Sequence, residues 1–250
     1  MPPKHGLPTD GDADMLTPPS SPRPQRPLPT LHGRLPPHPL RGVVFDLDGV
    51  ITDTAHFHFL AWQRLAQSLG LPFDEAFNET LKGIDRMGSL DRILAQGTAS
   101  YTPQEKLALA RQKNEQYVEL ISTMDSSQLL PGALPLLCEL RSKGIRTGLA
   151  SVSRNAPLVL NRLGIAHLFD HVVDVASIER PKPDPEIFAT AAARLGLDVT
   201  SCIGIEDAVA GVTSIKGAGM YAVGVGDPAV LHEADEVIPG LDHFHLQRYL

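Results

Sequence analysis

Short apolar runs recur along the chain, and longer helical stretches separate them. Runs of this kind are typical of strands that are buried on both faces of a parallel sheet. Parallel strands need long crossover connections, which are usually helical, so the alternation predicts an α/β fold with helices on both faces of the sheet. The runs are residues 43–47, 147–150, 202–205 and 221–225, with a weaker one at 172–175.

The segments after the second run carry apolar residues at helix spacing, and glycine follows three of them closely, as is common at helix ends. These predicted helices are residues 135–143, 157–163, 185–195 and 208–218.

Residues 54–124 break the alternation, because they contain only helical patterns. So many helices between the first two strands predict an inserted helical domain, and we expect it to cap the carboxyl ends of the strands, where α/β sites form. The predicted division is a core of residues 40–53 and 128–250 with a helical cap of residues 54–127. The predicted cap helices are residues 57–69, 75–81, 88–94 and 103–121.

The N-terminal segment has a different composition. Residues 1–39 hold 12 of the 22 prolines and show no helical or strand period. Dense prolines remove backbone donors and block both helix and sheet. We therefore expect a disordered tail.

Composition limits the possible functions. The net charge of −7 provides no basic surplus for a general nucleic-acid binder, although it is compatible with a small anionic substrate. Cys138 and Cys202 are too few for a disulfide scaffold, and we expect both to be buried, inert thiols in a reducing cytoplasm. No apolar run reaches the roughly 18 residues of a membrane span, and no apolar signal-peptide core is present. With no oligomer signal, we expect a monomer.

Polar side chains end the main apolar runs. Because the carboxyl ends of parallel strands meet at one edge of a sheet, these side chains should lie close together. A single Asp-x-Asp is common on surfaces, but several such groups, each ending an apolar run, indicate a site. The groups are Asp46 and Asp48, Ser151 with Ser153-Arg154-Asn155, Lys182, and Glu206-Asp207.

Clustered carboxylates repel one another, and burying them without compensation is costly. Mg²⁺ resolves this, since it prefers oxygen ligands and usually binds one or two carboxylates plus substrate phosphate. Lys182, between two prolines, would offset the negative charge. Ser151 lies at a strand-to-helix turn, where a hydroxyl and free N–H groups can hold phosphate oxygens. The pattern predicts phosphoryl transfer with Mg²⁺ as cofactor.

These residues resemble the four motifs of the haloacid-dehalogenase-like superfamily, over about residues 41–226. The resemblance implies a Rossmann-like core with an inserted helical cap. It implies that Asp46 is a nucleophile that forms an aspartyl phosphate and that Asp48 is the general acid/base. It also implies that magnesium is held by Asp46, the backbone carbonyl of Asp48, and the Glu206-Asp207 pair.

Residues in and beside the predicted cap limit the resemblance to one branch of the superfamily. Residues 48–58, 61–62 and 78–86 are similar to the β-phosphoglucomutase branch of the superfamily, and residues 111–117 and 151–155 fit its last cap helix and its substrate loop. The expected reaction is then the interconversion of β-D-glucose 1-phosphate and β-D-glucose 6-phosphate, primed by a sugar bisphosphate. Arg154 stands where lysine is frequent, so we expect a changed hydrogen-bond geometry with function retained.

A mutase must grip a second phosphate at a distance from Asp46. Arg86 is the candidate, because a guanidinium binds phosphate bidentately, and Lys113 would assist. The resemblance implies that His58 and Lys82 contact the sugar or help to place Asp48 when the cap closes. The predicted substrate-binding residues are Thr54, His58, Lys82, Gly83, Ile84, Arg86, Lys113, Ser153, Arg154 and Asn155.

Two alternatives stay open. One is a phosphatase for a sugar phosphate or another small metabolite, which would use the same residues. The other is an inactive scaffold that binds phosphosugars or a protein partner. Thr54, His58, Arg86 and Lys113 favour the mutase. The expected partners are a small sugar phosphate and its bisphosphate, with no nucleic acid and no membrane.

Overall fold

The computed structural model describes residues 36–81 and 84–250. Lys82 and Gly83, two of the predicted substrate-binding residues, lie outside the described residues, as does the proline-rich segment up to residue 35.

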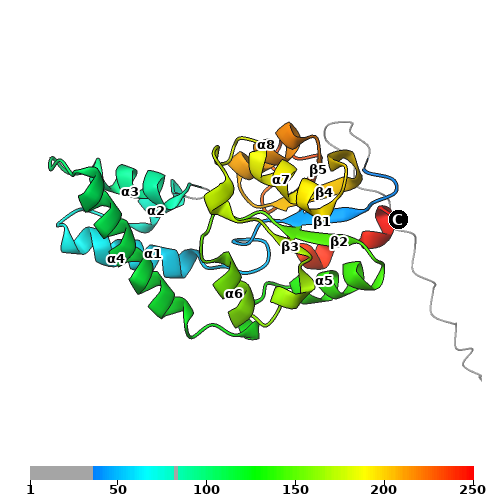
Figure 1. Cartoon of the computed structure of the whole chain (residues 1–250), viewed down its shortest axis with the longest axis horizontal. Helices are drawn as coiled ribbons and strands as arrows, with labels where there is room; N and C mark the ends of the chain where they lie inside the picture. The colour runs from blue at the N-terminus through cyan, green and yellow to red at the C-terminus, as the bar shows by residue number, and fades with distance from the viewer. Residues whose placement is uncertain (1–35, 82–83) are drawn as a thin grey trace, which may run out of the picture.

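A parallel sheet lies between helices in the larger part of the molecule (Figure 1). Its strands follow the order β3-β2-β1-β4-β5-β6. The order 3-2-1-4-5 is that of a Rossmann-like sheet, so the predicted fold class is confirmed. The weak run at 172–175 contributes only its first residue to a strand, and β6 was not predicted. The strands are β1 (Gly42–Phe45), β2 (Arg146–Leu149), β3 (His171–Val172), β4 (Cys202–Glu206), β5 (Tyr221–Val225) and β6 (Glu236–Ile238).

Helices cover both faces of the sheet, as Figure 1 shows. Val43 and Phe45 of β1 belong to the hydrophobic core that includes residues of α5 and α6, whereas Val44 belongs to the core with α7 and α8. Burial on both faces explains why the strands read as continuous apolar runs. These helices are α5 (Ala133–Ser142), α6 (Ala156–Arg162), α7 (Glu186–Leu195) and α8 (Val209–Ala218).

Four of the helices between β1 and β2 form what we call the helical unit. They lie together at one end of the molecule, beside the sheet (Figure 1), around a core of their own that includes Trp62 and Leu90. The last helix begins sharply because Thr102 and Glu105 form a capping box and Pro103, between them, is the first helical residue. The helices are α1 (Ala55–Ser68), α2 (Glu75–Glu79), α3 (Arg86–Leu94) and α4 (Pro103–Ile121).

The two segments that enter and leave the helical unit run side by side. Thr52 pairs with Leu129 in an antiparallel bridge, and its hydroxyl donates to the Gln128 carbonyl oxygen at 2.7 Å. Leu130 N donates to Ile51 O at 3.0 Å. The unit is therefore attached through one paired connection close to the end of β1.

The two cysteines differ in environment. Cys202 is buried on β4, as expected, but Cys138 is exposed, so that prediction was wrong. Leu136, Leu137 and Leu140 form the buried face of α5, and Cys138 points away from it. Both thiols are free. Within the described ranges, no helix combines the length and apolar character needed to cross a membrane.

Candidate active site

Asp46 follows β1 directly and lies at the carboxyl edge of the sheet. Its backbone N–H donates to Ile205 O of β4 at 2.9 Å, and its Oδ2 accepts from Asp48 N at 3.0 Å. The chain turns here through Gly49, whose φ of +76° suits glycine. A side chain at Gly49 would also collide with the carboxylate of Asp207. The turn therefore presents Asp46 and brings Asp207 close to it.

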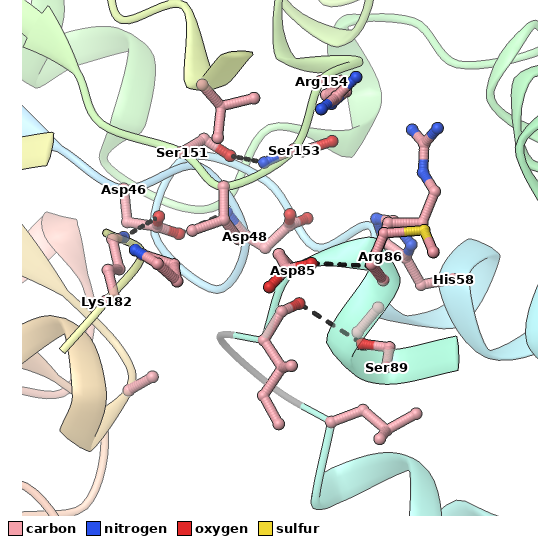
Figure 2. Close-up of a pocket in the computed structure, with 18 of the residues that line it drawn as sticks. Asp46, Asp48, His58, Asp85, Arg86, Ser89, Ser151, Ser153, Arg154 and Lys182 are labelled. Carbon is pink, nitrogen blue, oxygen red and sulfur yellow. Dashed lines mark hydrogen bonds and ion pairs between the residues drawn. The ribbon is translucent and has the colours of Figure 1, made fainter. Parts of the chain in front are cut away.

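Lys182 joins two buried carboxylates. Its Nζ donates to Asp46 Oδ1 at 2.6 Å and to Glu206 Oε2 at 2.8 Å (Figure 2 shows the contact with Asp46). Burial by itself would lower the pKa of Lys182, but the two carboxylates outweigh burial and raise it. The lysine is therefore a permanent cation, and it neutralises part of the charge around Asp46.

Three carboxylates fit a divalent cation. Asp46, Glu206 and Asp207 each offer an oxygen, and these oxygens lie within 4.8 Å of one another. Burial, and then the charge of Asp46, raise the pKa of Glu206, which means that its anion lacks sufficient compensation in the protein alone. A set of oxygen donors with excess negative charge suits a hard ion such as Mg²⁺. The side chain of Asp48 is outside this set.

Asp48 is tied to the start of α1. Its Oδ1 accepts from Thr54 N at 3.1 Å and from the Thr54 hydroxyl. Burial, followed by the charge of Asp46, raises the pKa of Asp48 to about 6, although the Thr54 hydrogen bonds lower it. Tyr117 of α4 donates to Thr54 Oγ1 at 3.2 Å and thereby fixes the hydroxyl. A carboxyl group with this pKa can both take and return a proton near neutral pH.

A buried lysine lies against the histidine in the helical unit. Lys113 Nζ donates to His58 Nδ1 at 2.7 Å and lies 4.6 Å from the Trp62 ring centroid. His58 stacks on Tyr117 with centroids 4.1 Å apart. Burial, and then the nearby Arg86, lower the pKa of Lys113 to about 7. Burial, and then Lys113, lower the pKa of His58, so the imidazole is neutral and accepts through Nδ1.

Arg86 and Arg154 line the same cavity as Lys113. Arg86 begins α3, where Asp85 caps the helix by accepting from Met87 N and Gly88 N. Burial, and then the like charge of Arg154, lower the pKa of Arg86. Arg154 is exposed. Within residues 36–81 and 84–250, neither guanidinium forms an ion pair. Two neighbouring guanidinium groups without a carboxylate partner favour an anionic ligand.

The loop after β2 provides further polar side chains that form hydrogen bonds beside the site. Ser151 is buried, and its Oγ accepts from Ser153 N at 3.1 Å (Figure 2). Asn155 stands at the N-terminus of α6 and donates from Nδ2 to Asn114 Oδ1 at 2.8 Å. Arg86 Nη2 donates to that same oxygen at 2.8 Å.

One cavity of about 790 Å³ collects most of the predicted residues from the core and the helical unit. Thr54 lies behind Asp48 and is fully buried, and Asn155 adjoins the loop that lines the cavity. The predicted residues that line it are Asp46, Asp48, His58, Ile84, Arg86, Lys113, Ser151, Ser153, Arg154, Lys182, Glu206 and Asp207.

Three residues contribute to the site without a predicted role. Trp62 packs in the core of the helical unit, as expected for a tryptophan, and it also lines the cavity against Lys113. Tyr117 and Asn114 make the contacts described above. Both lie in the stretch at 111–117 that carried the resemblance, which was the available signal for them.

Comparisons with known proteins agree on the family and the fold. A family model described as haloacid dehalogenase-like hydrolase matches residues 40–219. A β-phosphoglucomutase from Bacillus subtilis is 50% identical over 201 residues, which are 80% of this chain and 89% of that protein. A fructose-1-phosphate phosphatase from Escherichia coli is 33% identical over 188 residues, which are 74% of this chain and 95% of that protein.

Among solved structures, that of a β-phosphoglucomutase from Clostridium difficile matches with a TM-score of 0.81 and 44% sequence identity. The match covers 84% of this chain and 97% of that chain. The cavity residues from Asp46 to Asp207 all fall within the range that the family model matches.

Proposed function

The chain belongs to the haloacid dehalogenase-like hydrolase family, and from this premise we propose that it interconverts β-D-glucose 1-phosphate and β-D-glucose 6-phosphate. The observation that best supports this proposal is the arrangement of charged side chains in one cavity. Carboxylates and Lys182 surround Asp46 at the sheet edge, and the guanidinium groups of Arg86 and Arg154 also line the cavity. A substrate with a second phosphate explains both groups.

Asp46 is the proposed nucleophile. A carboxylate oxygen of Asp46 forms a bond to phosphorus while the bond from phosphorus to the sugar oxygen breaks, which gives an aspartyl phosphate. Lys182 neutralises charge beside Asp46, and Ser151 offers its hydroxyl to a phosphate oxygen. Mg²⁺ would be held by Asp46, Glu206, Asp207 and the backbone carbonyl of Asp48. The ion supplies charge neutralisation at the phosphoryl oxygens.

Asp48 is the proposed general acid/base. It takes the proton of the attacking sugar hydroxyl as phosphate leaves Asp46, and it protonates the sugar oxygen in the reverse direction. Its pKa of about 6 suits both roles near neutral pH. Thr54 holds Asp48 when no sugar is bound, and we propose that closure of the helical unit releases it. Transfer to a sugar hydroxyl then outruns transfer to water.

The helical unit and the loop after β2 together supply the proposed grip on the second phosphate and the sugar. Arg86 and Arg154 carry charge that complements a phosphate dianion, and Lys113 adds to it while protonated. The bisphosphate intermediate turns round and presents its other phosphate to Asp46, so the grip must accept either end of the sugar. The proposed sugar and phosphate contacts are His58, Lys82, Gly83, Ile84, Ser153 and Asn155.

A coupled assay tests the proposal. With Mg²⁺, a bisphosphate primer and pure β-D-glucose 1-phosphate, NADPH should form through glucose-6-phosphate dehydrogenase without release of inorganic phosphate. Asp46→Asn is the control and should abolish phosphoenzyme formation. The alternative is a sugar-phosphate phosphatase, which the likeness to the fructose-1-phosphate phosphatase favours. Inorganic phosphate without NADPH would establish that alternative, and no phosphoenzyme at all would indicate a scaffold.

We also propose that residues 54–127 act as a cap domain on the core of residues 40–53 and 128–250, and that the protein works as a monomer in the cytoplasm. The two free thiols are compatible with a reducing compartment. Gel filtration and light scattering would test the monomer.

A further inference from the structure

The side-chain oxygen of Asn114 joins the helical unit to the loop after β2 beside the cavity. Asn114 lies half-buried on α4. Its Oδ1 accepts one hydrogen bond from Arg86 Nη2 and one from Asn155 Nδ2, each at 2.8 Å. Arg86 belongs to the helical unit and Asn155 to the loop after β2. Two donors from different parts of the fold therefore converge on one oxygen.

We propose that Asn114 is a positioning residue for the second phosphate, and that its Oδ1 occupies the place of a phosphate oxygen until substrate arrives. This inference rests on the proposed function, since only a substrate with a distal phosphate needs the device. Two nitrogens that each lie 2.8 Å from one atom cannot be farther apart than twice that distance. One phosphate group can thus accept from both donors.

The replacement of the Asn114 amide oxygen by a phosphate oxygen strengthens the hydrogen bonds of both donors. Both donors pass from a neutral amide oxygen to a charged phosphate oxygen, and bonds to charged acceptors are about twice as strong. Before that, Asn114 holds the long Arg86 side chain in one orientation, which lowers the entropy lost on binding.

This role of Asn114 requires that its side-chain amide carries no charge. An aspartate at this position would form an ion pair with Arg86 and would repel the phosphate dianion. An asparagine orients the guanidinium without competing for it by charge. Asn114→Ala and Asn114→Asp therefore separate positioning from a merely structural hydrogen bond, which the aspartate would preserve.

Steady-state kinetics give the first test. Asn114→Ala should raise KM for β-D-glucose 1-phosphate about tenfold and change kcat much less. Asn114→Asp should raise KM further. Phosphorylation of Asp46 by acetyl phosphate, which has no second phosphate, should slow by less than about twofold in either variant. Gln112→Ala, at an exposed position on the same helix, is the matched control and should match wild type.

Binding gives a test that does not need turnover. In an Asp46→Asn background, titration calorimetry with Mg²⁺ and glucose 1,6-bisphosphate should show about tenfold weaker binding for Asn114→Ala, and still weaker binding for Asn114→Asp. A wild-type protein without mutase turnover would refute the proposed function alone, because this measurement still decides the role of Asn114. Wild-type affinity in Asn114→Asp, or an equal loss with acetyl phosphate and glucose phosphate, would overturn the inference.

Discussion

Asp48 Oδ1 accepts hydrogen bonds from both the backbone N–H and the hydroxyl of Thr54, the residue directly before α1. Tyr117 of α4 donates to that hydroxyl oxygen in turn. The proposed acid/base is thus bound to the helical unit, while Asp46 is bound to the sheet through Ile205. A movement of the unit relative to the sheet would change the position of Asp48 relative to Asp46.

Thr54→Val tests whether this tie restrains hydrolysis. Valine keeps the branched shape and the backbone N–H but removes the hydroxyl donor. Hydrogen bonds to charged groups contribute about 1.5–3 kcal/mol, so Asp48 should be released at least about tenfold more often. We expect phosphoenzyme made with acetyl phosphate to hydrolyse about tenfold faster in the absence of sugar. Thr80→Val, which removes an exposed hydroxyl bonded to Phe77 O, is the control. A phosphoenzyme with the wild-type lifetime in Thr54→Val would contradict the restraint.

Lys182→Met should destabilise the protein. Methionine fills a similar volume but leaves Asp46 and Glu206 buried without their cation. Breaking a buried ion pair in this way costs about 3–5 kcal/mol. We expect Mg²⁺ to raise the thermal midpoint more in this variant than in wild type, because the ion replaces the lost charge. Lys143→Met, at an exposed position, should change neither value. A variant as stable as wild type without Mg²⁺ would show that Lys182 does not hold the carboxylates.

The sheet and the carboxyl-edge residues could be predicted because they depend on local pattern. Each long strand is buried on both faces, so its apolar run ends where the chain leaves the sheet, and parallel topology brings these ends together. Asp46 and Glu206 follow from that rule alone, whereas Lys182 lies in the loop between β3 and α7 and was selected for its place between two prolines. The family match supports the resemblance on which the cap residues were chosen.

The features that could not be predicted from the sequence, β6 and the role of Asn114, depend on tertiary contacts. β6 has only three residues and starts with Glu236, whose buried carboxylate accepts from the Tyr249 hydroxyl at 2.7 Å. A run that begins with a glutamate does not read as a buried strand. Asn114 acquires its role from Asn155, 41 residues away in the sequence, and no periodicity indicates that pairing.

Gly211→Ala should damage the carboxylate group around Asp46. A Cβ at Gly211 would overlap the side chain of Glu206, so the carboxylate must move. Overpacking of this kind costs about 1–3 kcal/mol. Gly217→Ala on the same helix is the matched control. Its Cβ would meet Pro185 at 3.4 Å, and alanine should stabilise the helix by about 0.5–1 kcal/mol. In urea denaturation we expect the free energy of unfolding to fall in Gly211→Ala and to rise in Gly217→Ala. We expect weaker Mg²⁺ binding in Gly211→Ala only. A change of the same sign in both variants would contradict this account.

Lys113 should make both stability and substrate affinity depend on pH. Burial lowers its pKa from 10.5 to about 7 in the folded protein. Between these values the unfolded chain binds more protons, so the free energy of unfolding should rise with pH through this window. The shift of about 3.5 pKa units corresponds to at most about 5 kcal/mol.

Lys113→Met removes the titrating group and keeps a long apolar side chain between Trp62 and Tyr117. The variant should be more stable than wild type at about pH 7, and this difference should shrink as the pH approaches 10, because wild-type Lys113 no longer carries its charge there. In wild type, KM for β-D-glucose 1-phosphate should rise above about pH 7 as the attraction for phosphate is lost, and in Lys113→Met this rise should be absent. Urea denaturation and initial rates across the same pH range measure both effects. A difference in stability that does not change with pH would mean that Lys113 keeps its proton in the folded protein.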